Sequence, residues 1–432
     1  MGWIIQRRAP DGRRQIPRVA VTVVAAILVA SAARAAAVED TSSPPGATVE
    51  EFLVLAHRLS PALAARALES DAASARVDAA GALDDPLLTI TSDEDRDEHG
   101  SRQNKMIYGV EQEIPLWGKR ALRRGIAVAE ADGAQARQRQ ALLDLDAEIK
   151  IAFAAYYRAS RALRIQDIVH ALLHTVSDSA QGRYAQGLGT QAEAIQAEVE
   201  KSRLLLERQR LERDRRLAAA RLNTLVARSP GAALADPVAL RPIPMADELR
   251  PDQLLEQARL SNPLVATAAA EITAAEGDRQ LVERSWYPDI TLGAAAIQRE
   301  DAADGFIVSA GIRVPLQWGL REAQAREATA KLGAARSRRD SELLKLEGSL
   351  AAALADLDAA RQSGAVLTHE LTPQVEAAYQ AALTAYQLGR GSLTAVLEAA
   401  HHIQEVQLEG LAIEEQTETA IATIERIIGR EL

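Results

Sequence analysis

The chain has 432 residues, a net charge of −10 and no cysteine, and aromatic side chains make up only 3% of it. The absence of cysteine excludes disulfides, thiolate metal sites and a lipid-modified N-terminal cysteine, so a lipoprotein is not expected. The acidic balance argues against a nucleic-acid partner. Ala, Leu, Glu, Gln and Arg prevail, a composition that favours long, closely packed helices.

Residues 1–35 have the layout of a secretory signal peptide. Arginines lead into an apolar run at 19–30, and Ala33, Arg34 and Ala35 form a small-x-small cleavage pattern. The apolar run has about 12 residues, whereas a membrane-spanning helix needs roughly 20. We therefore expect export with cleavage of residues 1–35, rather than a membrane anchor.

Residues 36–227 are predicted to form a helix, two strands and a long helical hairpin. Thr48 and Glu51 fit a capping box that would begin the first helix. The expected elements are a helix to about 82, strands at about 86–95 and 105–115 around a charged loop, and helices at about 118–183 and up to 227.

Residues 228–250 contain four prolines and are predicted to be a linker. Residues 251–432 then repeat the plan of the first half. The expected elements are a helix at about 251–284, strands at about 288–299 and 305–315 around a turn, and helices at about 319–384 and 393–429. Landmarks recur in the same order at offsets of 200–202 residues, which indicates an internal duplication.

The pattern Tyr-x-x-Gly-x-Gly-Ser/Thr occurs twice, at 184–190 and at 386–392. Glycines permit positive φ where a helix must reverse, and the hydroxyl of Thr190 or Ser392 can cap the returning helix. Each copy is therefore predicted to be the tip of a helical hairpin. A helix of about 65 residues is roughly 100 Å long, so the hairpins are expected to pack side by side.

The predicted strands alternate apolar and polar residues, and their length suits tilted strands that cross a bilayer. The apolar positions include Met106, Tyr108, Val110, Ile114, Ile290, Leu292, Ala294, Ala296, Phe306, Val308, Ala310, Ile312 and Val314. Glu111, Glu113 and Arg313 are expected to face a water-filled lumen. Four strands cannot close a membrane barrel, so several chains must share one, and three would supply 12 strands.

Three tryptophans, Trp117, Trp286 and Trp318, lie at junctions between predicted strands and helices. Aromatic side chains collect at the headgroup level of membranes, so we expect these three at the membrane interface. The alternative is that they fill the junctions as core residues.

This duplicated plan, with Pro-Leu-Trp-Gly at 115–118 and the tip motif, resembles the TolC-like outer membrane efflux proteins over nearly all of residues 48–430. The resemblance implies a mainly α fold with a small membrane β-barrel. It implies a homotrimer whose 12-stranded barrel lies in the outer membrane of a Gram-negative bacterium and continues as an α-helical tunnel through the periplasm.

The resemblance also implies the function of such proteins, which are the exit ducts of tripartite efflux pumps. The expected partners are outer membrane lipid, a periplasmic adaptor (membrane fusion) protein and an inner-membrane transporter of RND type. Residues 112–119 are similar to the corresponding run of heavy-metal ducts of the Czc and Cus type. This similarity favours metal cations over drugs or other solutes only weakly.

The resemblance places both tips at the periplasmic mouth, where an adaptor would dock. The expected docking residues are Gly187, Leu188, Gly189, Thr190, Gly389, Arg390, Gly391 and Ser392. The alternative is that the glycines only make the turns.

Family members narrow the channel with two acids after the second tip. Here Glu398 keeps one acid and Ala395 replaces the other, so a constriction would use Glu398 and Glu193, unless both glutamates simply face solvent.

Other chemistry is not expected. His170 and His174 are one helical turn apart, but no third ligand is evident, so we favour solvent-facing histidines and predict no metal site. The chain has no phosphate loop, His-Glu-x-x-His or Gly-x-Ser-x-Gly motif, so neither an enzyme nor a cofactor is predicted. The alternative function is a soluble periplasmic coiled-coil scaffold, which would leave the four alternating strands unexplained.

Overall fold

The computed structural model describes residues 44–96, 102–245, 249–299 and 302–432. The expected signal peptide at 1–35 lies outside these residues. Residues 46–432 form one unit, which contains the helices and strands that the structure describes.

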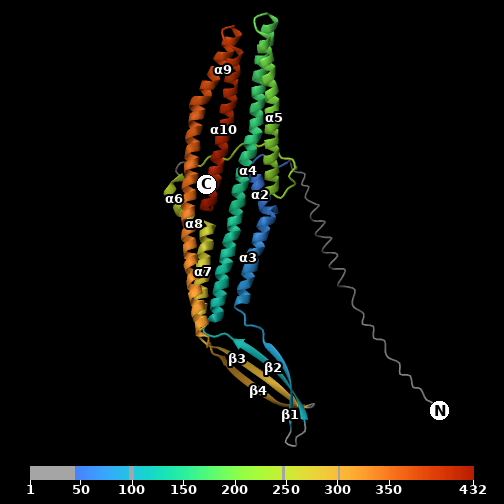
Figure 1. Cartoon of the computed structure of the whole chain (residues 1–432), viewed down its shortest axis with the longest axis vertical. Coiled ribbons are helices and arrows are strands. Elements are labelled where there is room, and N and C mark those ends of the chain that lie inside the picture. The colour runs from blue at the N-terminus through green and yellow to red at the C-terminus, as the bar shows by residue number, and fades with distance from the viewer. Residues whose placement is uncertain (1–43, 97–101, 246–248, 300–301) are drawn as a thin grey trace, which may run out of the picture. The chain divides into compact units, whose positions relative to one another are not determined.

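Long helices dominate this unit. Before residue 228 they are α2 (Val49–Leu59), α3 (Pro61–Ala80), α4 (Lys119–Ala185) and α5 (Gln191–Leu225). After residue 250 they are α6 (Pro251–Ser261), α7 (Pro263–Arg284), α8 (Trp318–Val366), α9 (Thr372–Gln387) and α10 (Leu393–Ile428). The α4–α5 and α9–α10 hairpins lead to two tips at one end of the unit, and a four-stranded sheet lies at the other end (Figure 1).

Proline divides two helices that the sequence predicts as continuous. The predicted single helices lie at about 48–82 and 251–284. Each is in fact a pair of helices, broken before Pro61 and before Pro263. A proline disfavours helical backbone angles in the residue that precedes it. Accordingly, Ser60 and Asn262 are extended, with ψ of 116° and 124°, and each ends one helix and begins the next.

Replacing Asn262 with Ala is expected to destabilise the protein by about 2 kcal/mol, from a lost helix cap and an unpaired buried carbonyl. The buried Asn262 accepts a hydrogen bond from the Leu264 amide at 2.8 Å and donates one to the Ile427 carbonyl at 2.8 Å. The control is Ser60→Ala, which loses only a 3.4 Å cap bond at the other break. Chemical unfolding at one protein concentration compares the variants, and equal losses would contradict this account.

The capping box expected at the start of the first helix does not form. Thr48 precedes α2, but its side chain makes no cap bond. Glu51 instead accepts a hydrogen bond from the Gly46 amide at 2.8 Å, two residues before the position that a capping box uses. The Glu51 carboxylate therefore binds the loop before α2 and not, as the motif would predict, the N-terminal end of the helix.

The helix expected at 319–384 is also interrupted. It contains a π-helical turn at Leu367–Leu371, after which α9 begins with Pro373 in its first turn. Proline has no N–H to donate and its ring collides with the preceding turn, so a widened turn is a physical way to accommodate it. The Leu367 carbonyl accepts both the backbone N–H of Thr372 and, at 2.8 Å, its hydroxyl, so Thr372 closes the widened turn with two hydrogen bonds.

The four strands form one antiparallel sheet in the order β1-β2-β3-β4. They are β1 (Leu87–Arg96), β2 (Arg102–Ile114), β3 (Asp289–Arg299) and β4 (Ala302–Arg313). β1 and β3 lie close to their predicted bounds, whereas β2 and β4 begin earlier than the sequence predicts, at Arg102 instead of about 105 and at Ala302 instead of about 305. Asp93 lies opposite Lys105 in the paired strands, and opposite charges at such positions stabilise the pairing.

The register sorts the sheet into an apolar face and a polar face. Val110 lies opposite both Leu88 and Ala294, and Ala294 lies opposite Val308, so apolar positions of all four strands share one face. The polar face also carries four glycines, namely Gly109, Gly293, Gly305 and Gly311. The apolar face is open to solvent in the single chain: Leu88 is 75% exposed, Phe306 84% and Val308 76%.

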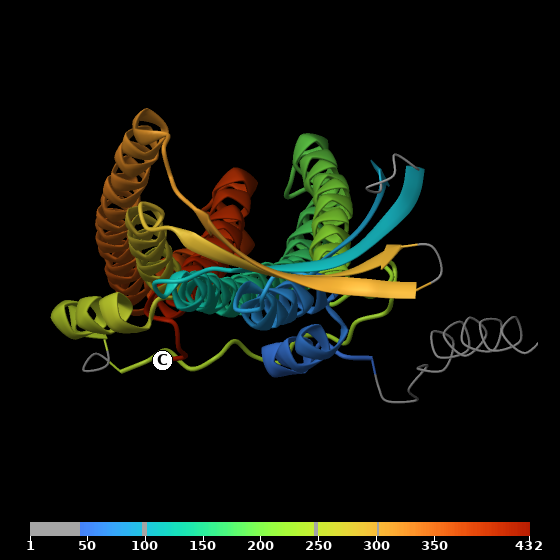
Figure 2. The same cartoon turned by 90° about the horizontal axis from the view of Figure 1, so that it is seen from below.

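The described part of the predicted linker, residues 228–250, crosses one side of the long helices (Figure 2). Its backbone is bonded to both hairpins. The Tyr156 hydroxyl of α4 donates to the Ala235 carbonyl at 3.1 Å, and Arg361 of α8 donates to the Pro244 carbonyl at 2.8 Å. The segment is therefore bound along its length.

A buried ion network surrounds Arg241 of this segment. Its guanidinium contacts Glu425 of α10 at 3.0 and 3.1 Å and Glu418 at 3.2 Å. Lys150 of α4 binds Glu425 at 2.9 Å and Glu431 at 2.8 Å. Lys150, Glu418 and Glu425 are each only 4% exposed. The network joins α4, α10 and the linker at one level of the helices.

Candidate functional site at the hairpin tips and the sheet

The first tip joins α4 to α5 through a glycine in the left-handed region. Gly187 has a φ of 72°, and the amides of Leu188 and Gly189 donate to the carbonyl of Arg183 at 2.8 and 3.2 Å. The Thr190 hydroxyl then caps α5 by accepting an amide hydrogen bond at 3.2 Å.

The second tip makes the same turn. Gly389 has a φ of 74°, and the amides of Arg390 and Gly391 donate to the Ala385 carbonyl at 2.9 and 3.0 Å. The Ser392 hydroxyl caps α10 with a 3.2 Å bond. The turn and the hydroxyl caps predicted from the duplicated motif are therefore confirmed.

The two glycines of each motif have different tasks. Only the first has positive φ. The second lies too close to the preceding helix to carry a side chain easily. A Cβ at Gly189 would be 3.2 Å from the Arg183 Cβ, and a Cβ at Gly391 would be 3.0 Å from the Tyr386 nitrogen.

Arg183 connects the two tips, and the sequence does not indicate this role. Its Nη1 donates to the Tyr386 carbonyl at 2.9 Å, its Nη2 donates to the Leu188 carbonyl at 3.1 Å, and its guanidinium lies 5.0 Å from the centre of the Tyr386 ring. The position of Arg183 corresponds to Ala385 in the second half, so the internal repeat does not single it out. One cation therefore holds both turns through neighbouring backbone carbonyls.

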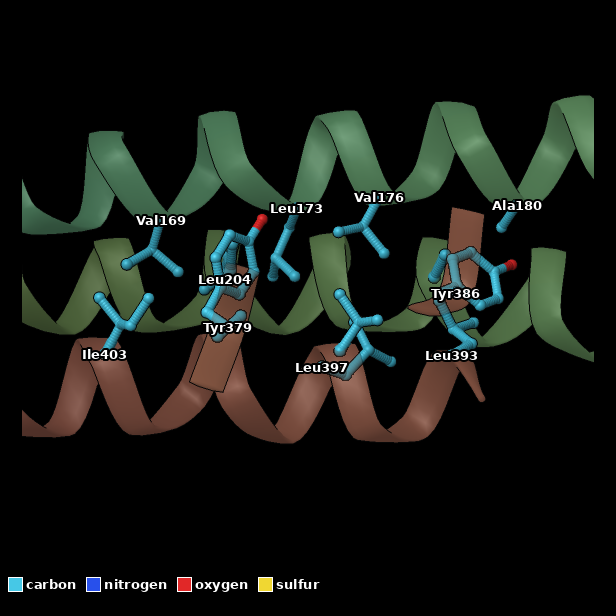
Figure 3. Packing of buried hydrophobic residues seen from close by; sticks show 13 residues of the cluster. Val169, Leu173, Val176, Ala180, Leu204, Tyr379, Tyr386, Leu393, Leu397 and Ile403 are labelled. Atoms are coloured by element: carbon cyan, nitrogen blue, oxygen red, sulfur yellow. The ribbon is translucent and has the colours of Figure 1, made fainter. Parts of the chain in front are cut away.

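Tyr386 is fully buried near the tips. It belongs to an apolar cluster that also contains Leu173, Val176 and Leu397 and to which α4, α5, α9 and α10 all contribute (Figure 3). Burial raises the pKa of the Tyr386 hydroxyl, the nearby Glu193 carboxylate raises it further, and the Arg183 guanidinium opposes both effects. The hydroxyl therefore stays protonated at neutral pH.

The two glutamates of the expected constriction lie on different hairpins. Glu193 is half-buried in the first turn of α5, and its Oε2 has no hydrogen-bond partner among the described residues. Glu398 is exposed on α10, where it lines a groove against α9. Within a single chain they form no shared acidic site, so a constriction of both residues stays a prediction.

The expected lumen-facing residues share the polar face of the sheet. Glu111 lies opposite Leu87 and Gly293. Glu113 and Arg313 lie on β2 and β4, on either side of β3, and Arg313 Nη1 binds Glu113 Oε1 at 2.7 Å. The ion pair neutralises two of the three charges, so Glu111 is the one of this set without a partner among the described residues.

The expected interface tryptophans lie at the junctions of strands and helices. Trp117 has a φ of 60°, donates to the Pro288 carbonyl at 2.9 Å and packs against Tyr287 with ring centres 5.2 Å apart. Lys119 reinforces the same junction, with Nζ 2.8 Å from Asp289 and 2.9 Å from the Tyr287 carbonyl. Trp286 and Trp318 are both exposed in the single chain, and the membrane role of all three stays a prediction.

Several of the histidines lie beside acidic residues on the helices. His174 Nδ1 is 3.0 Å from Asp178, His401 Nε2 is 3.3 Å from Glu200, and His402 Nδ1 is 3.5 Å from Glu405. In the part of the chain that the structure describes, no group of three or more His, Asp and Glu side chains could hold a metal ion. None of the described helices has an apolar stretch long enough to cross a membrane.

Long helical hairpins with paired tips at one end and a small sheet at the other form the mainly helical architecture of TolC-like channels. A family model described as outer membrane efflux protein matches residues 53–228 and 254–430. The chain belongs to this family, so the resemblance seen in the sequence is confirmed.

Individual relatives agree with this assignment. The chain is 28% identical over 184 residues to the cobalt-zinc-cadmium resistance protein CzcC from Cupriavidus metallidurans, a match that spans 41% of this chain and 43% of that protein. Among solved structures, CusC has a TM-score of 0.77 at 14% identity, with 91% of this chain and 96% of CusC covered. The outer membrane protein VceC from Vibrio cholerae has a TM-score of 0.73 at 20% identity, with 89% and 96% covered. At these identities the solved structures establish a common fold.

Proposed function

We propose that this chain is one of three that form the outer membrane exit duct of a tripartite efflux pump. The three sheets would close a 12-stranded barrel in the outer membrane of a Gram-negative bacterium, and the helical hairpins would continue it as a tunnel through the periplasm. Family membership supports this function, and the observation that carries it furthest is the segregation of the sheet into an exposed apolar face and a polar face.

The composition of the two faces supports a barrel with lipid outside and water inside. Apolar residues, from Ala294 to Phe306 in size, predominate on one face, and a barrel in a bilayer needs such a face toward lipid. All four glycines in the described parts of the strands lie on the polar face, where small residues let a sheet curve inward. Glu111, Glu113 and Arg313 would then face the lumen, and Trp117, Trp286 and Trp318 would mark the membrane interface.

The sheet ends in two open edges, β1 and β4. An edge within a bilayer must be paired, because unpaired backbone groups there cost several kcal/mol each. Pairing β1 of one copy with β4 of the next is a head-to-tail contact, which closes into a ring. Three copies would give the 12 strands of the proposed trimer.

The remaining boundaries are part of the same proposal. Residues 1–35 would be removed as a signal peptide on export, residues 36–227 and 251–432 would be the two repeats, and residues 228–250 would link them. The linker crosses one side of the helices and is bonded to α4 and α8. It would therefore lie on the outside of the tunnel wall, away from the lumen.

The two tips would be the docking surface for a periplasmic adaptor protein, which would connect the duct to an inner-membrane transporter of RND type. Both tips present exposed backbone in the same geometry, and Arg183 holds them together. Glu193 and Glu398 lie within the turns next to the tips and would narrow the entrance. The name of the CzcC relative supports heavy-metal cations as cargo, and the proposed activity is passage rather than catalysis.

Replacing Gly187 and Gly389 together with Val is expected to abolish efflux and to leave the trimer intact. A Cβ at Gly187 would have no atom outside the turn within 4 Å, so the cost there comes from positive φ, which a β-branched residue adopts poorly. The tips would rearrange while the sheet, far from them, would be unaffected. Efflux is measured as the resistance of cells that carry the variant, and trimer formation is measured as the particle mass of the extracted protein.

The matched control is the replacement of both glycines with Asn, which tolerates the left-handed region. This variant should keep most of the efflux. Full resistance in the Val variant would show that the tips do not dock a partner.

The mass of the detergent-extracted protein, measured by light scattering with the detergent subtracted, tests the proposal as a whole. Three chains per particle are expected. A single chain that needs no detergent would overturn the duct and would favour the alternative, a soluble periplasmic scaffold.

A further inference from the structure

The helices next to the sheet stand in a row, in the same order as the strands. α3 packs against α4, α4 against α7 and α7 against α8, while the strands are ordered β1-β2-β3-β4 (Figure 2). β1 follows α3 in the chain, and β4 precedes α8. The outer faces of α3 and α8 are therefore the two ends of the helical row, just as β1 and β4 are the open edges of the sheet.

The internal duplication relates this row to itself. Pro61 at the start of α3 corresponds to Pro263 at the start of α7, an offset of 202 residues. Gly118 before α4 corresponds to Gly319 in α8, an offset of 201 residues. These two offsets assign each residue of α3 and α4 an equivalent in α7 and α8.

The helix pairs that the duplication makes equivalent, α3 with α4 and α7 with α8, pack alike. Arg76 of α3 lies 3.7 Å from Glu130 of α4. At the equivalent positions, Asp278 of α7 attracts Lys331 of α8, with the two charges exchanged. The offsets therefore relate contacts in the structure as well as landmarks in the sequence.

The contact between α4 and α7 is close, and small residues form it. A Cβ at Gly133 of α4 would lie 3.5 Å from the Cβ of Ala270 on α7, and a Cβ at Gly277 of α7 would lie 2.7 Å from Ile126 Cγ1. Small residues three and four positions from Gly133 share its face and are buried with it. They are Ala129 and Ala136.

Both sides of this contact have equivalents that are open in the single chain. The equivalents of the buried α4 residues lie on α8 and are all exposed, namely Ala330, Ala334 and Ser337. The equivalent of Ala270 is Leu68 on α3, and this large apolar side chain is 67% exposed. Ala75, the equivalent of Gly277, is exposed beside it. The two ends of the row thus carry the two halves of a contact that the chain already makes once.

We propose that α8 of one copy packs against α3 of the next copy as α4 packs against α7 within the chain, with Ala334 against Leu68 of the neighbouring copy. This inference rests on the proposed function, because it needs the head-to-tail ring, and it extends the contact from the sheet edges to the helical wall. β4 and β1 of the same two copies would pair directly beside it. A head-to-tail contact uses two different faces of one chain, and the duplication accounts for their complementarity.

The side chains fit this arrangement with one departure. The small Ala334 leaves a hollow in the surface of α8, into which the ridge formed by Leu68 can pack. Leu and Ala together are larger than Gly133 and Ala270, so the helices would lie somewhat further apart between copies. Glu327 stands where the duplication would place a counterpart of Ile126. Lys331 binds its carboxylate at 2.7 Å, so Glu327 needs no partner from the neighbouring copy.

The test is the cross-linking of two cysteines, one on each face, in the full chain, which has no cysteine of its own. Membranes that contain Leu68→Cys/Ala334→Cys are treated with a short bis-maleimide, which bridges thiols further apart than a disulfide does. The chains are then separated by mass under denaturing conditions. Because each chain carries both faces, a closed ring should give a covalent trimer.

Two further variants serve as controls. Gly133→Cys/Ala270→Cys probes the equivalent contact within the chain, so it should consume both thiols and keep the mass of one chain. Arg66→Cys/Ala334→Cys is the matched negative control. Arg66 is also exposed, but it precedes Leu68 by two residues and therefore points to nearly the opposite side of α3. This variant should yield single chains.

Two results would overturn the proposal: single chains from Leu68→Cys/Ala334→Cys, or equal cross-linking of the Arg66 variant. The particle mass of the extracted, untreated variant separates this inference from the proposed function. A trimer that does not cross-link would leave the duct standing and remove this contact. Cross-linked chains from a particle that is not a trimer would do the reverse, and single chains by both measurements would remove both.

Discussion

Val308→Arg is expected to abolish assembly of the duct. Val308 lies near the middle of β4, is 76% exposed in the single chain and belongs to the apolar face of the sheet. In the proposed barrel this face contacts lipid. An arginine at the bilayer midplane costs about 2–4 kcal/mol in a membrane barrel, and a trimer would incur this cost three times. The measurement is the trimer yield in detergent extracts of the outer membrane.

Ser309→Arg is the matched control. Ser309 is the next residue on the same strand and faces the opposite side of the sheet, where it lies across from Gly293. The same arginine would there point into water, with room beside the glycine. The trimer should form in near-normal yield. Equal yields for the two variants would show that the apolar face does not meet lipid.

Arg241→Met is expected to destabilise the folded protein by about 3–5 kcal/mol, the range for removing one partner of a buried ion pair. Arg241 is the cation that contacts Glu418 in the described network, whereas Glu425 also has Lys150. The variant would leave the Glu418 carboxylate buried without its cation. Urea unfolding at a fixed protein concentration measures the loss, because an oligomer's apparent stability depends on concentration.

The loss should depend on pH in a direction that the structure defines. Burial raises the pKa of Glu418 above its ordinary value, and Arg241 opposes the shift. A raised folded-state pKa means that the folded protein binds the proton more readily than the unfolded chain, so stability falls as pH rises through this range. Without Arg241 the pKa would rise further. The destabilisation should therefore be largest at pH 8 and smaller at pH 5.

Arg259→Met is the control for this experiment. Arg259 pairs with Glu347 at the protein surface, with side chains 52% and 35% exposed. An exposed pair contributes at most about 1 kcal/mol, and its loss should not steepen the pH dependence. A pH-independent loss in Arg241→Met, or a loss no larger than that of the control, would contradict the role of the network.

The ion network and the Arg183 contacts connect the hairpins at two different levels of the bundle. Arg241 joins α10 to the linker at the level where the helices are crossed, and Arg183 joins the two tips through Tyr386 and Leu188. Between these levels the hairpins meet through the apolar cluster around Tyr386. Substitutions at the tips should therefore leave the ion network intact. The interpretation of the Gly187 and Gly389 variants depends on this separation.

Local signals in the sequence determined much of the molecule. The tip motif predicts its own turns, because positive φ and hydroxyl caps depend on the glycine and the Ser or Thr alone. Strand alternation predicts two faces, because side chains alternate along any strand. The duplicated order of elements sufficed to indicate the family, since it compares the chain with itself.

The prolines at the helix breaks are weaker local signals. The sequence contains Pro61, Pro263 and Pro373, but proline is tolerated in a first helical turn, so its position alone does not separate a helix start from an interruption. The structure resolves each case through the residue before the proline, which is extended at Ser60 and Asn262 and helical at Thr372.

Only the tertiary structure decided which distant residues meet. Register brings the apolar stripes of four strands, nearly 200 residues apart, to one face, and packing brings Arg183 to Tyr386 and Arg241 to Glu418. No periodicity encodes such contacts, because each depends on how two separate helices are rotated and displaced against one another. By itself the sequence determined the long helices, the strands, the tips and the duplicated order of these elements. The breaks within the helices and the pairing of charges across the bundle follow from packing, which sequence spacing does not specify.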